Sequence, residues 1–160
     1  AKNRAPGLNR DFTAMNWSIF DRSVWQQARD EARSKEFHGD YIIVGSDIDP
    51  KAIEIARENA RRAGVDDVVR FEVADATKFD RRTERGVIVT NPPYGERIME
   101  KQQAEELYRG FGRAWLASEN WQLYLLSSHT EFERCFGKQA DKKRKLYNGM
   151  IKCDLFMYFK

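Results

Sequence analysis

Residues 41–64 read YIIVGSDIDPKAIEIARENARRAG, a short apolar run followed by a longer amphipathic one. The run at 41–47 is rich in β-branched residues and ends in Gly-Ser-Asp, which predicts a buried strand. Asp49 is suited to cap a helix that begins at Pro50, and Gly64 is suited to end it. A strand that leads directly into a helix is the repeating unit of α/β proteins.

The same alternation of helix and strand continues on both sides of this unit. The other predicted elements are a helix over 21–35, strands over 68–73 and 86–90, a helix over 100–118, a strand over 121–128 and a helix over 131–137. The tail differs, because Asn148-Gly149 lies between two alternating segments and predicts an antiparallel hairpin. We therefore expect an α/β fold whose parallel sheet becomes mixed at the C-terminal hairpin.

Composition limits the class of protein. A chain of 160 residues is the size of one domain, and 41% hydrophobic residues are enough for a core. No run approaches the roughly 18 apolar residues of a membrane span, so no membrane association is expected. Cys135, Cys153, His38 and His129 are isolated and match no zinc spacing, so no metal site is expected. The cysteines are expected to be free thiols in a reducing cytoplasm rather than a disulfide.

Three polar side chains follow the predicted strands where each strand ends. Asp47 ends the first, Asp75 follows the second, and Asn91 follows the third. In an open α/β sheet, ligands bind at the carboxyl ends of the strands, and an acidic residue there can accept both hydroxyls of a ribose. Asp75 could accept from the exocyclic amine of a bound base. A structural role stays open for both aspartates, since Asp47 could cap the helix beginning at Pro50 and Asp75 could be a turn residue.

The third predicted strand is followed by Asn-Pro-Pro-Tyr-Gly at 91–95, which we call the hook. Its two prolines lack N–H donors and have a fixed φ, so the chain cannot pair onward and is held extended. The Asn91 amide oxygen and the Pro92 carbonyl oxygen can accept the two hydrogens of one planar –NH2 group. Tyr94 can stack on the ring that carries this amine, and Gly95 allows the ring to approach. The hook therefore indicates alkylation of nitrogen on a planar base or amide.

Several stretches together resemble a known family. They are DIDPKAIEIARENARRAGV at 47–65, FEVADAT at 71–77 and TNPPYGERI at 90–98. In this order they are similar to class I S-adenosylmethionine-dependent amino-methyltransferases. RAPGLNRDF at 4–12 and FGKQADKKRKLYNGMIKCDLFMYF at 136–159 resemble the RlmL/YpsC group, the THUMP-associated 23S rRNA guanine-N2 methyltransferases. This resemblance covers nearly the whole chain and implies a Rossmann-like fold and one methyltransferase domain over 1–160.

The resemblance implies a cofactor site for S-adenosylmethionine, which leaves as S-adenosylhomocysteine. Asp47 would bind the cofactor ribose and Ile48 would pack on its adenine. Asp75 would accept from the adenine amine, and the Ala76 backbone N–H would reach the ring. Asn91 is assigned both to this site and, together with Pro92 and Tyr94, to catalysis.

The resemblance also implies an RNA site, most simply on ribosomal RNA. Asn91, Pro92 and Tyr94 would hold the target guanine after it leaves its stack. The residues that would contact the substrate around them are Pro93, Gly95, Arg97, Lys142, Lys143, Arg144 and Lys145. From composition alone, a plain solvated surface is an equal reading of this basic cluster, because the net charge is only +3.

One departure from the family concerns its first strand, which carries a glycine-rich loop around the methionine part of the cofactor. No such segment precedes 41–47, so the chain is expected to be an N-terminal truncation without its first strand or THUMP domain. A sheet that lacks a middle strand would expose the edges of the neighbouring strands.

The leading interpretation is a methyltransferase that acts on the exocyclic N2 of guanine in RNA. An adenine-N6 DNA methyltransferase is the first alternative, because the Asn-Pro-Pro-Tyr motif serves both chemistries. A non-catalytic RNA-binding fragment of a longer enzyme is the second. The oligomeric state stays open.

Overall fold

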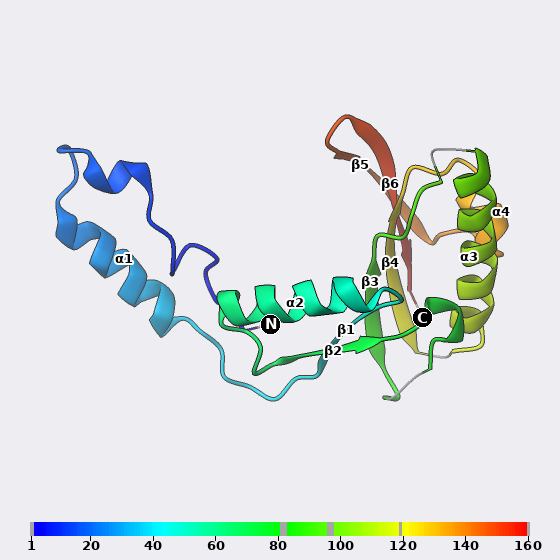
Figure 1. Ribbon diagram of the computed structural model, residues 1–160, viewed down its shortest axis with the longest axis horizontal. Coiled ribbons are helices and arrows are strands. Elements are labelled where there is room, and N and C mark those ends of the chain that lie inside the picture. Colours follow the sequence, from blue (N-terminus) through cyan, green and yellow to red (C-terminus); the bar gives the residue numbers. More distant parts are fainter. Residues whose placement is uncertain (1, 81–82, 96–97, 119, 160) are drawn as a thin grey trace. The chain divides into compact units, whose positions relative to one another are not determined.

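The computed structural model describes residues 2–80, 83–95, 98–118 and 120–159, without the side chains of 98 and 99. Two compact units follow one another along the chain, Ala1–Val73 and Ala74–Lys160, and each is described by itself (Figure 1). The first unit contains η1 (Thr13–Asn16), α1 (Arg22–Ser34), β1 (Ile43–Asp47), α2 (Pro50–Ala63) and β2 (Val69–Val73). The second contains η2 (Ala76–Lys78), β3 (Gly86–Thr90), α3 (Ile98–Leu116), β4 (Trp121–Ser127), α4 (Phe132–Phe136), β5 (Lys142–Asn148) and β6 (Ile151–Tyr158). Within the described ranges, no helix combines the length and apolar character that a membrane crossing requires.

The two longer helices of the first unit begin at the caps that the sequence predicts. The Asp21 carboxylate accepts from the Ser23 backbone N–H at 2.7 Å, and the Asp49 carboxylate accepts from the Lys51 N–H at 2.9 Å. These bonds satisfy backbone donors that a helix start otherwise leaves without partners. α2 ends before Gly64, whose φ of +65° closes the helix. The predicted helix positions are therefore confirmed.

The first unit has a two-stranded sheet in which β1 and β2 run parallel, with Asp47 opposite Val73. The prediction that the first strand is buried is wrong. Val44 is 44% exposed, and no residue of β1 is buried. The reason is that β2 is the only strand that pairs with β1 within the described residues, and only α2 packs on this pair. An apolar strand becomes buried only when neighbours cover its two faces and edges.

The second unit contains a four-stranded mixed sheet in the order β3-β4-β6-β5. β3 and β4 are parallel, whereas β6 runs antiparallel to both β4 and β5. In Figure 1, α3 and α4 lie together on one side of this sheet. The expected α/β fold with a mixed sheet and a C-terminal hairpin is confirmed.

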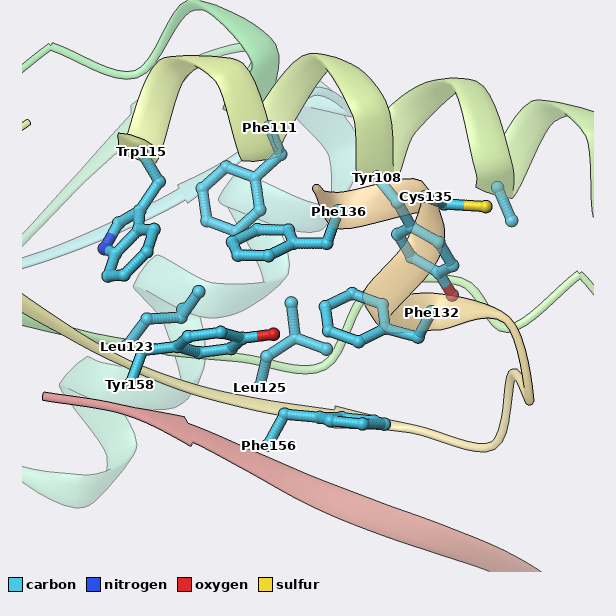
Figure 2. Packing of buried hydrophobic residues seen from close by; sticks show 11 residues of the cluster. Tyr108, Phe111, Trp115, Leu123, Leu125, Phe132, Cys135, Phe136, Phe156 and Tyr158 are labelled. Carbon is cyan, nitrogen blue, oxygen red and sulfur yellow. The ribbon is translucent and has the colours of Figure 1, made fainter. Parts of the chain in front are cut away.

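The core of the second unit lies between this sheet and the two helices. Figure 2 shows its large side chains, of which Trp115 and Tyr108 come from α3 and are fully buried. The Trp115 ring packs 5.6 Å from the Phe136 ring and 5.2 Å from the Tyr158 ring, measured between centroids. Cys135 and Cys153 are buried free thiols, as expected. This core joins the helices to the sheet and supports the segment that leaves β3.

The hairpin turn lies one residue later than Asn148-Gly149 would place it. Asn148 is the last residue of β5 and pairs with Ile151, so Gly149 and Met150 form the two-residue turn. Gly149 has a φ of +61°, which residues with a side chain rarely adopt. Because Asn148 belongs to the strand, its side chain has a fixed direction.

Candidate functional site

The hook begins where β3 ends. β3 pairs with β4 as far as Thr90, opposite Leu125, and the chain then leaves the sheet at Asn91. Neither proline has an N–H with which to extend the ladder, so pairing stops at this point. Asn91 is exposed and Pro92 is half-buried, so both reach the surface at the carboxyl end of the strand. This is the edge at which α/β sheets bind ligands.

A chain of hydrogen bonds connects the hook to the hairpin. The Asn148 side-chain N–H donates to the Tyr94 hydroxyl at 3.3 Å, and that hydroxyl donates to the Asn91 amide oxygen at 2.5 Å. Burial, together with the neighbouring Cys153 thiol, raises the pKa of the Tyr94 phenol. The phenol therefore keeps its proton at neutral pH and remains a donor to Asn91. The hairpin thus orients the amide through Tyr94.

A second chain of hydrogen bonds connects the backbone of the hook to the buried core. The Tyr108 hydroxyl donates to the Pro93 carbonyl oxygen at 2.6 Å and lies 3.2 Å from the Ser127 hydroxyl. A phenol has one proton, so Ser127 donates to Tyr108, and the His129 backbone N–H donates to Ser127 at 3.1 Å. Tyr108 and Ser127 are buried, and such chains of hydroxyls reinforce one another. The core therefore anchors the Pro93 carbonyl.

Two oxygens of the hook remain available as acceptors. No donor among the described residues reaches the Pro92 carbonyl, because Tyr108 engages the next carbonyl instead. The Asn91 amide oxygen accepts from Tyr94 and has a second lone pair. Two fixed acceptors side by side in the chain can take both hydrogens of an –NH2 group and draw electron density onto its nitrogen. The arrangement is suited to holding an exocyclic amine as a nucleophile.

Gly95 connects the hook to α3, and the structure adds a reason for glycine at this position. Its φ is +68°, and a Cβ would lie 2.6 Å from the Lys101 Cα and 2.8 Å from the Glu100 carbonyl oxygen. Glycine is therefore required by the close approach of α3. The predicted role of Gly95 in substrate approach stays a prediction.

A pocket of about 370 Å³ opens beside the hook. The residues lining it are Pro93, Tyr94 and Gly95 of the hook and Glu100, Gln103, Ala104 and Leu107 of α3. The sequence predicted Pro93 and Gly95 as substrate contacts and Tyr94 as a catalytic residue, and the structure adds residues of α3. A planar ring that entered this pocket would contact Tyr94.

Asp47 and Ile48 of the predicted cofactor site belong to the first unit. The Asp47 carboxylate is exposed and accepts from the Asp49 backbone N–H at 2.9 Å, which stabilises the turn before α2. Asp49, not Asp47, caps the helix. The bond to Asp49 uses one carboxylate oxygen of Asp47, and Ile48 is 70% exposed. Both side chains are therefore accessible to a ligand.

Asp75 and Ala76 belong to the second unit. The Asp75 carboxylate accepts from the Thr77 backbone N–H at 2.9 Å and from the Thr77 hydroxyl at 2.8 Å, so it caps η2 as the turn reading expects. These hydrogen bonds lower the pKa of Asp75, which keeps the carboxylate ionised. Its other oxygen lies 3.9 Å from the Lys78 ammonium group. Both hydrogen bonds from Thr77 go to one oxygen of the Asp75 carboxylate, so the other oxygen can still contact a ligand. Ala76 is exposed.

The basic residues of β5 differ in their surroundings, and their predicted contacts with the substrate stay a prediction. The Lys143 ammonium group pairs with Glu133 of α4 at 2.8 Å and lies over the Phe156 ring, 5.8 Å from its centroid. Lys142, Arg144 and Lys145 are exposed and make no ion pair within the described part of the chain. Arg97, another predicted substrate contact, lies outside the described residues.

Sequence reasoning missed two residues that position the hook. Tyr108 lies on the apolar face of the predicted helix 100–118 and is expected there only as a core residue. Asn148 is expected only as a turn residue. No local pattern indicates that either side chain reaches the hook, because Asn148 is 54 residues from Tyr94 and Tyr108 is 15 residues from Pro93.

The fold and the hook together define the class of protein. A mixed, Rossmann-like α/β sheet that presents Asn-Pro-Pro-Tyr at the carboxyl end of a parallel strand is characteristic of the methyltransferase fold. The family model for the RMKL-like methyltransferase domain, UPF0020, matches residues 1–156. The chain belongs to this family.

Two curated relatives illustrate the family. YpsC of Bacillus subtilis (strain 168), named as an RNA methyltransferase, is 42% identical over 159 residues, covering 99% of this chain and 41% of that protein. The ribosomal RNA large subunit methyltransferase K/L of Aliivibrio fischeri (strain MJ11) is also 42% identical over 159 residues, covering 93% of this chain and 22% of that protein. The chain thus spans less than half the length of these relatives.

Solved structures agree with the fold. SMU.472, described as a methyltransferase in complex with SAH, is 38% identical with a TM-score of 0.93, covering 99% of this chain and 42% of that one. A protein of Listeria monocytogenes (strain 4b F2365), described as an N6-adenine-specific DNA methylase, is 40% identical with a TM-score of 0.91. It covers 99% of this chain and 41% of that one.

Proposed function

We propose that this chain is the part of an enzyme that transfers a methyl group from S-adenosylmethionine to the exocyclic N2 amine of guanine in ribosomal RNA. The observation that carries the proposal is the hook, in which Asn91 and Pro92 present free acceptor positions while Tyr108 and Asn148 hold their neighbours. The named activity of the K/L relative on large-subunit ribosomal RNA favours RNA as the substrate. A cytoplasmic location and a single methyltransferase domain over 1–160 are parts of this proposal.

In this mechanism the target guanine leaves its stack and enters the pocket beside the hook. Asn91 and Pro92 accept from the two N–H groups of its amine, and Tyr94 packs on the ring. S-adenosylmethionine, when bound, supplies an electrophilic methyl group on a sulfonium. The contribution of the chain is orientation, which can supply roughly 7–11 kcal/mol of a barrier in well-aligned cases. No strongly basic side chain is required, because the amine gains nucleophilicity from its two acceptors. Once the methyl group has passed from sulfur to nitrogen, the cationic amine is strongly acidic and releases its extra proton to water.

The proposal keeps the predicted cofactor role of each carboxylate that follows a strand. Asp47 would accept from the ribose hydroxyls with Ile48 beside the adenine, and Asp75 would accept from the adenine amine with the Ala76 N–H near the ring. The exposed Asp47 and Ile48 and the ionised Asp75 fit these roles. The complex of SMU.472 with SAH supports the same cofactor for this chain. Asn91 keeps its predicted part in both cofactor binding and catalysis.

The proposal is tested by incubating the chain with labelled S-adenosylmethionine and three substrates: unmodified large-subunit rRNA, single-stranded DNA and duplex DNA. Nuclease digestion and mass spectrometry then identify the product. N2-methylguanosine from rRNA alone is the expected result. N6-methyladenine in DNA would support the alternative that the Listeria relative's description favours. RNA binding without any methylated product would leave this chain a non-catalytic fragment.

The predicted cofactor site makes its own prediction. Asp47→Ala should weaken binding of S-adenosylhomocysteine by about 10- to 100-fold, because hydrogen bonds to a charged group contribute about 1.5–3 kcal/mol. Isothermal titration calorimetry measures this. Asp49→Ala is the matched control, since it removes a carboxylate two residues away that caps α2. That control should lower stability by about 1 kcal/mol without changing the affinity. Equal losses in the two variants would contradict a ribose contact at Asp47.

The hydroxyl that anchors the hook makes another prediction. Tyr108→Phe should lower kcat for methyl transfer by about 10- to 100-fold with little change in KM, since small misplacements of reacting groups have effects of this size. Tyr158→Phe is the matched control, because Tyr158 is equally buried and donates to the Lys138 carbonyl oxygen at 3.0 Å. Both changes should lower stability by about 0.5–1.5 kcal/mol. A similar kcat in the two variants would show that Tyr108 is only structural.

A further inference from the structure

One face of the hairpin brings together three side chains that the sequence scatters. β5 and β6 pair with Tyr147 opposite Lys152 and Lys145 opposite Asp154. Directly opposite residues share a face of a sheet, and so do residues two apart along a strand. Lys145, Tyr147 and Lys152 therefore lie on the same face. Arg144, the sequence neighbour of Lys145 in β5, lies on the opposite face, because side chains alternate along a strand.

The Tyr147 ring is unusually free for an aromatic side chain in a strand. It is 72% exposed, and it makes no ring contact with any other aromatic side chain that the structure describes. Lys145 and Lys152 are exposed and form no ion pair within the described ranges. Lys143 lies on the same face but pairs with Glu133, so its charge is already engaged. An open aromatic ring thus lies directly opposite Lys152 and two residues from Lys145, which has Asp154 opposite it in the hairpin.

The opposite face of the hairpin turns toward the hook. Asn148 donates to the Tyr94 hydroxyl, and Cys153 on the same face is buried. The residue after Tyr147 in the chain is therefore bonded to the hook itself. A ligand that lay on Tyr147 would therefore be on the other face of the hairpin, one residue along β5 from the side chain that bonds to the hook.

We propose that Tyr147 is a stacking platform for an unpaired base that flanks the target nucleotide, and that Lys145 and Lys152 contact the adjoining phosphates. This inference rests on the proposed function, and it adds that the site binds RNA in its single-stranded form. Aromatic rings stack on unpaired bases without regard to sequence, and lysines beside them follow the backbone. Bases in a duplex are already stacked, so the platform selects single-stranded RNA.

The test compares affinities of the full chain for a short fluorescein-labelled single-stranded RNA and for the same RNA annealed to its complement. Fluorescence anisotropy gives the dissociation constants. Tyr147→Ala should weaken binding of the single strand by about 5- to 150-fold, the range that loss of one stacked base produces. Tyr147→Phe, which keeps the ring, should bind like the unchanged chain. Lys152→Ala should reduce the salt dependence by about one phosphate contact.

Phe159→Ala is the matched control, because Phe159 is a 43% exposed aromatic residue that follows β6 at the other end of the hairpin. It should leave RNA affinity unchanged. Equal affinity of Tyr147→Ala and the unchanged chain would overturn the platform and leave methyl transfer to RNA untouched. Binding that is lost only in Lys145→Ala and Lys152→Ala would also overturn stacking, since charge alone would explain it. An unchanged chain that methylates no RNA refutes the proposed function separately from these outcomes.

Discussion

Asn91→Ala is expected to lower the rate of methyl transfer by at least about 100- to 1,000-fold, the effect of removing one oriented polar group from a reaction centre. Asn91 is the only side chain in the proposed pair of acceptors, because its partner is the Pro92 carbonyl. Alanine removes the acceptor and also leaves the Tyr94 hydroxyl without the partner at 2.5 Å. Single-turnover kinetics at saturating cofactor and RNA measures the chemical step directly.

Tyr94→Phe is the control that separates the two parts of this effect. It keeps the ring that packs on the base but removes the hydroxyl that orients Asn91. A smaller loss, about 10-fold, is expected, because Asn91 would still be present but less well held. Both variants should keep the thermal stability of the unchanged chain, since Asn91 is exposed and the ring remains. A full rate in Asn91→Ala would remove the hook from the mechanism.

Trp115→Ala is expected to lower the free energy of unfolding by about 3–5 kcal/mol, as large-to-small changes of buried aromatic residues do. Trp115 is fully buried between α3 and the sheet and contacts the Phe136 and Tyr158 rings. The Lys138 ammonium group also lies 5.5 Å from its ring centroid. Removing the indole would leave a cavity in the core that supports Tyr108. Urea denaturation followed by far-UV circular dichroism measures the loss.

Trp17→Ala is the matched control for this change. Trp17 is 57% exposed and stacks only on Phe20 among the aromatic side chains that the structure describes. The same chemical change there should lower stability by less than about 1 kcal/mol, since little apolar area is returned to water. Equal effects at the two tryptophans would contradict the burial of Trp115.

The order of helices and strands is predictable because its signals are local. β3 begins and ends where the sequence predicts, and α2 begins after Asp49 and ends before Gly64. Caps, periodicity and prolines act through neighbouring residues, so a short stretch is sufficient to specify an element. The prediction that β1 is buried is wrong because burial is not a local property. Hydrophobicity shows what a strand prefers to contact, but burial depends on which other segments are there to cover it.

The hook, too, is predictable from the sequence only in part. The end of strand pairing after Thr90 and the polar residue that follows it can be predicted from Asn91 and the two prolines. The hydrogen bonds that hold the hook cannot be predicted from the sequence, because Tyr108 and Asn148 come from a helix and a hairpin further along the chain. A tyrosine on an apolar helix face predicts burial, but the partner of its hydroxyl depends on how the helix packs.

By itself the sequence determined the alternation of helix and strand, the end of β3 and the residues that form the hook. Only the tertiary structure decided which carbonyl Tyr108 anchors, that Lys143 is paired with Glu133, and that Tyr147 shares a face with Lys152. The physical reason is the range of the interactions. Backbone preferences and caps act over a few residues, whereas hydrogen bonds, ion pairs and strand register join residues that only folding brings together.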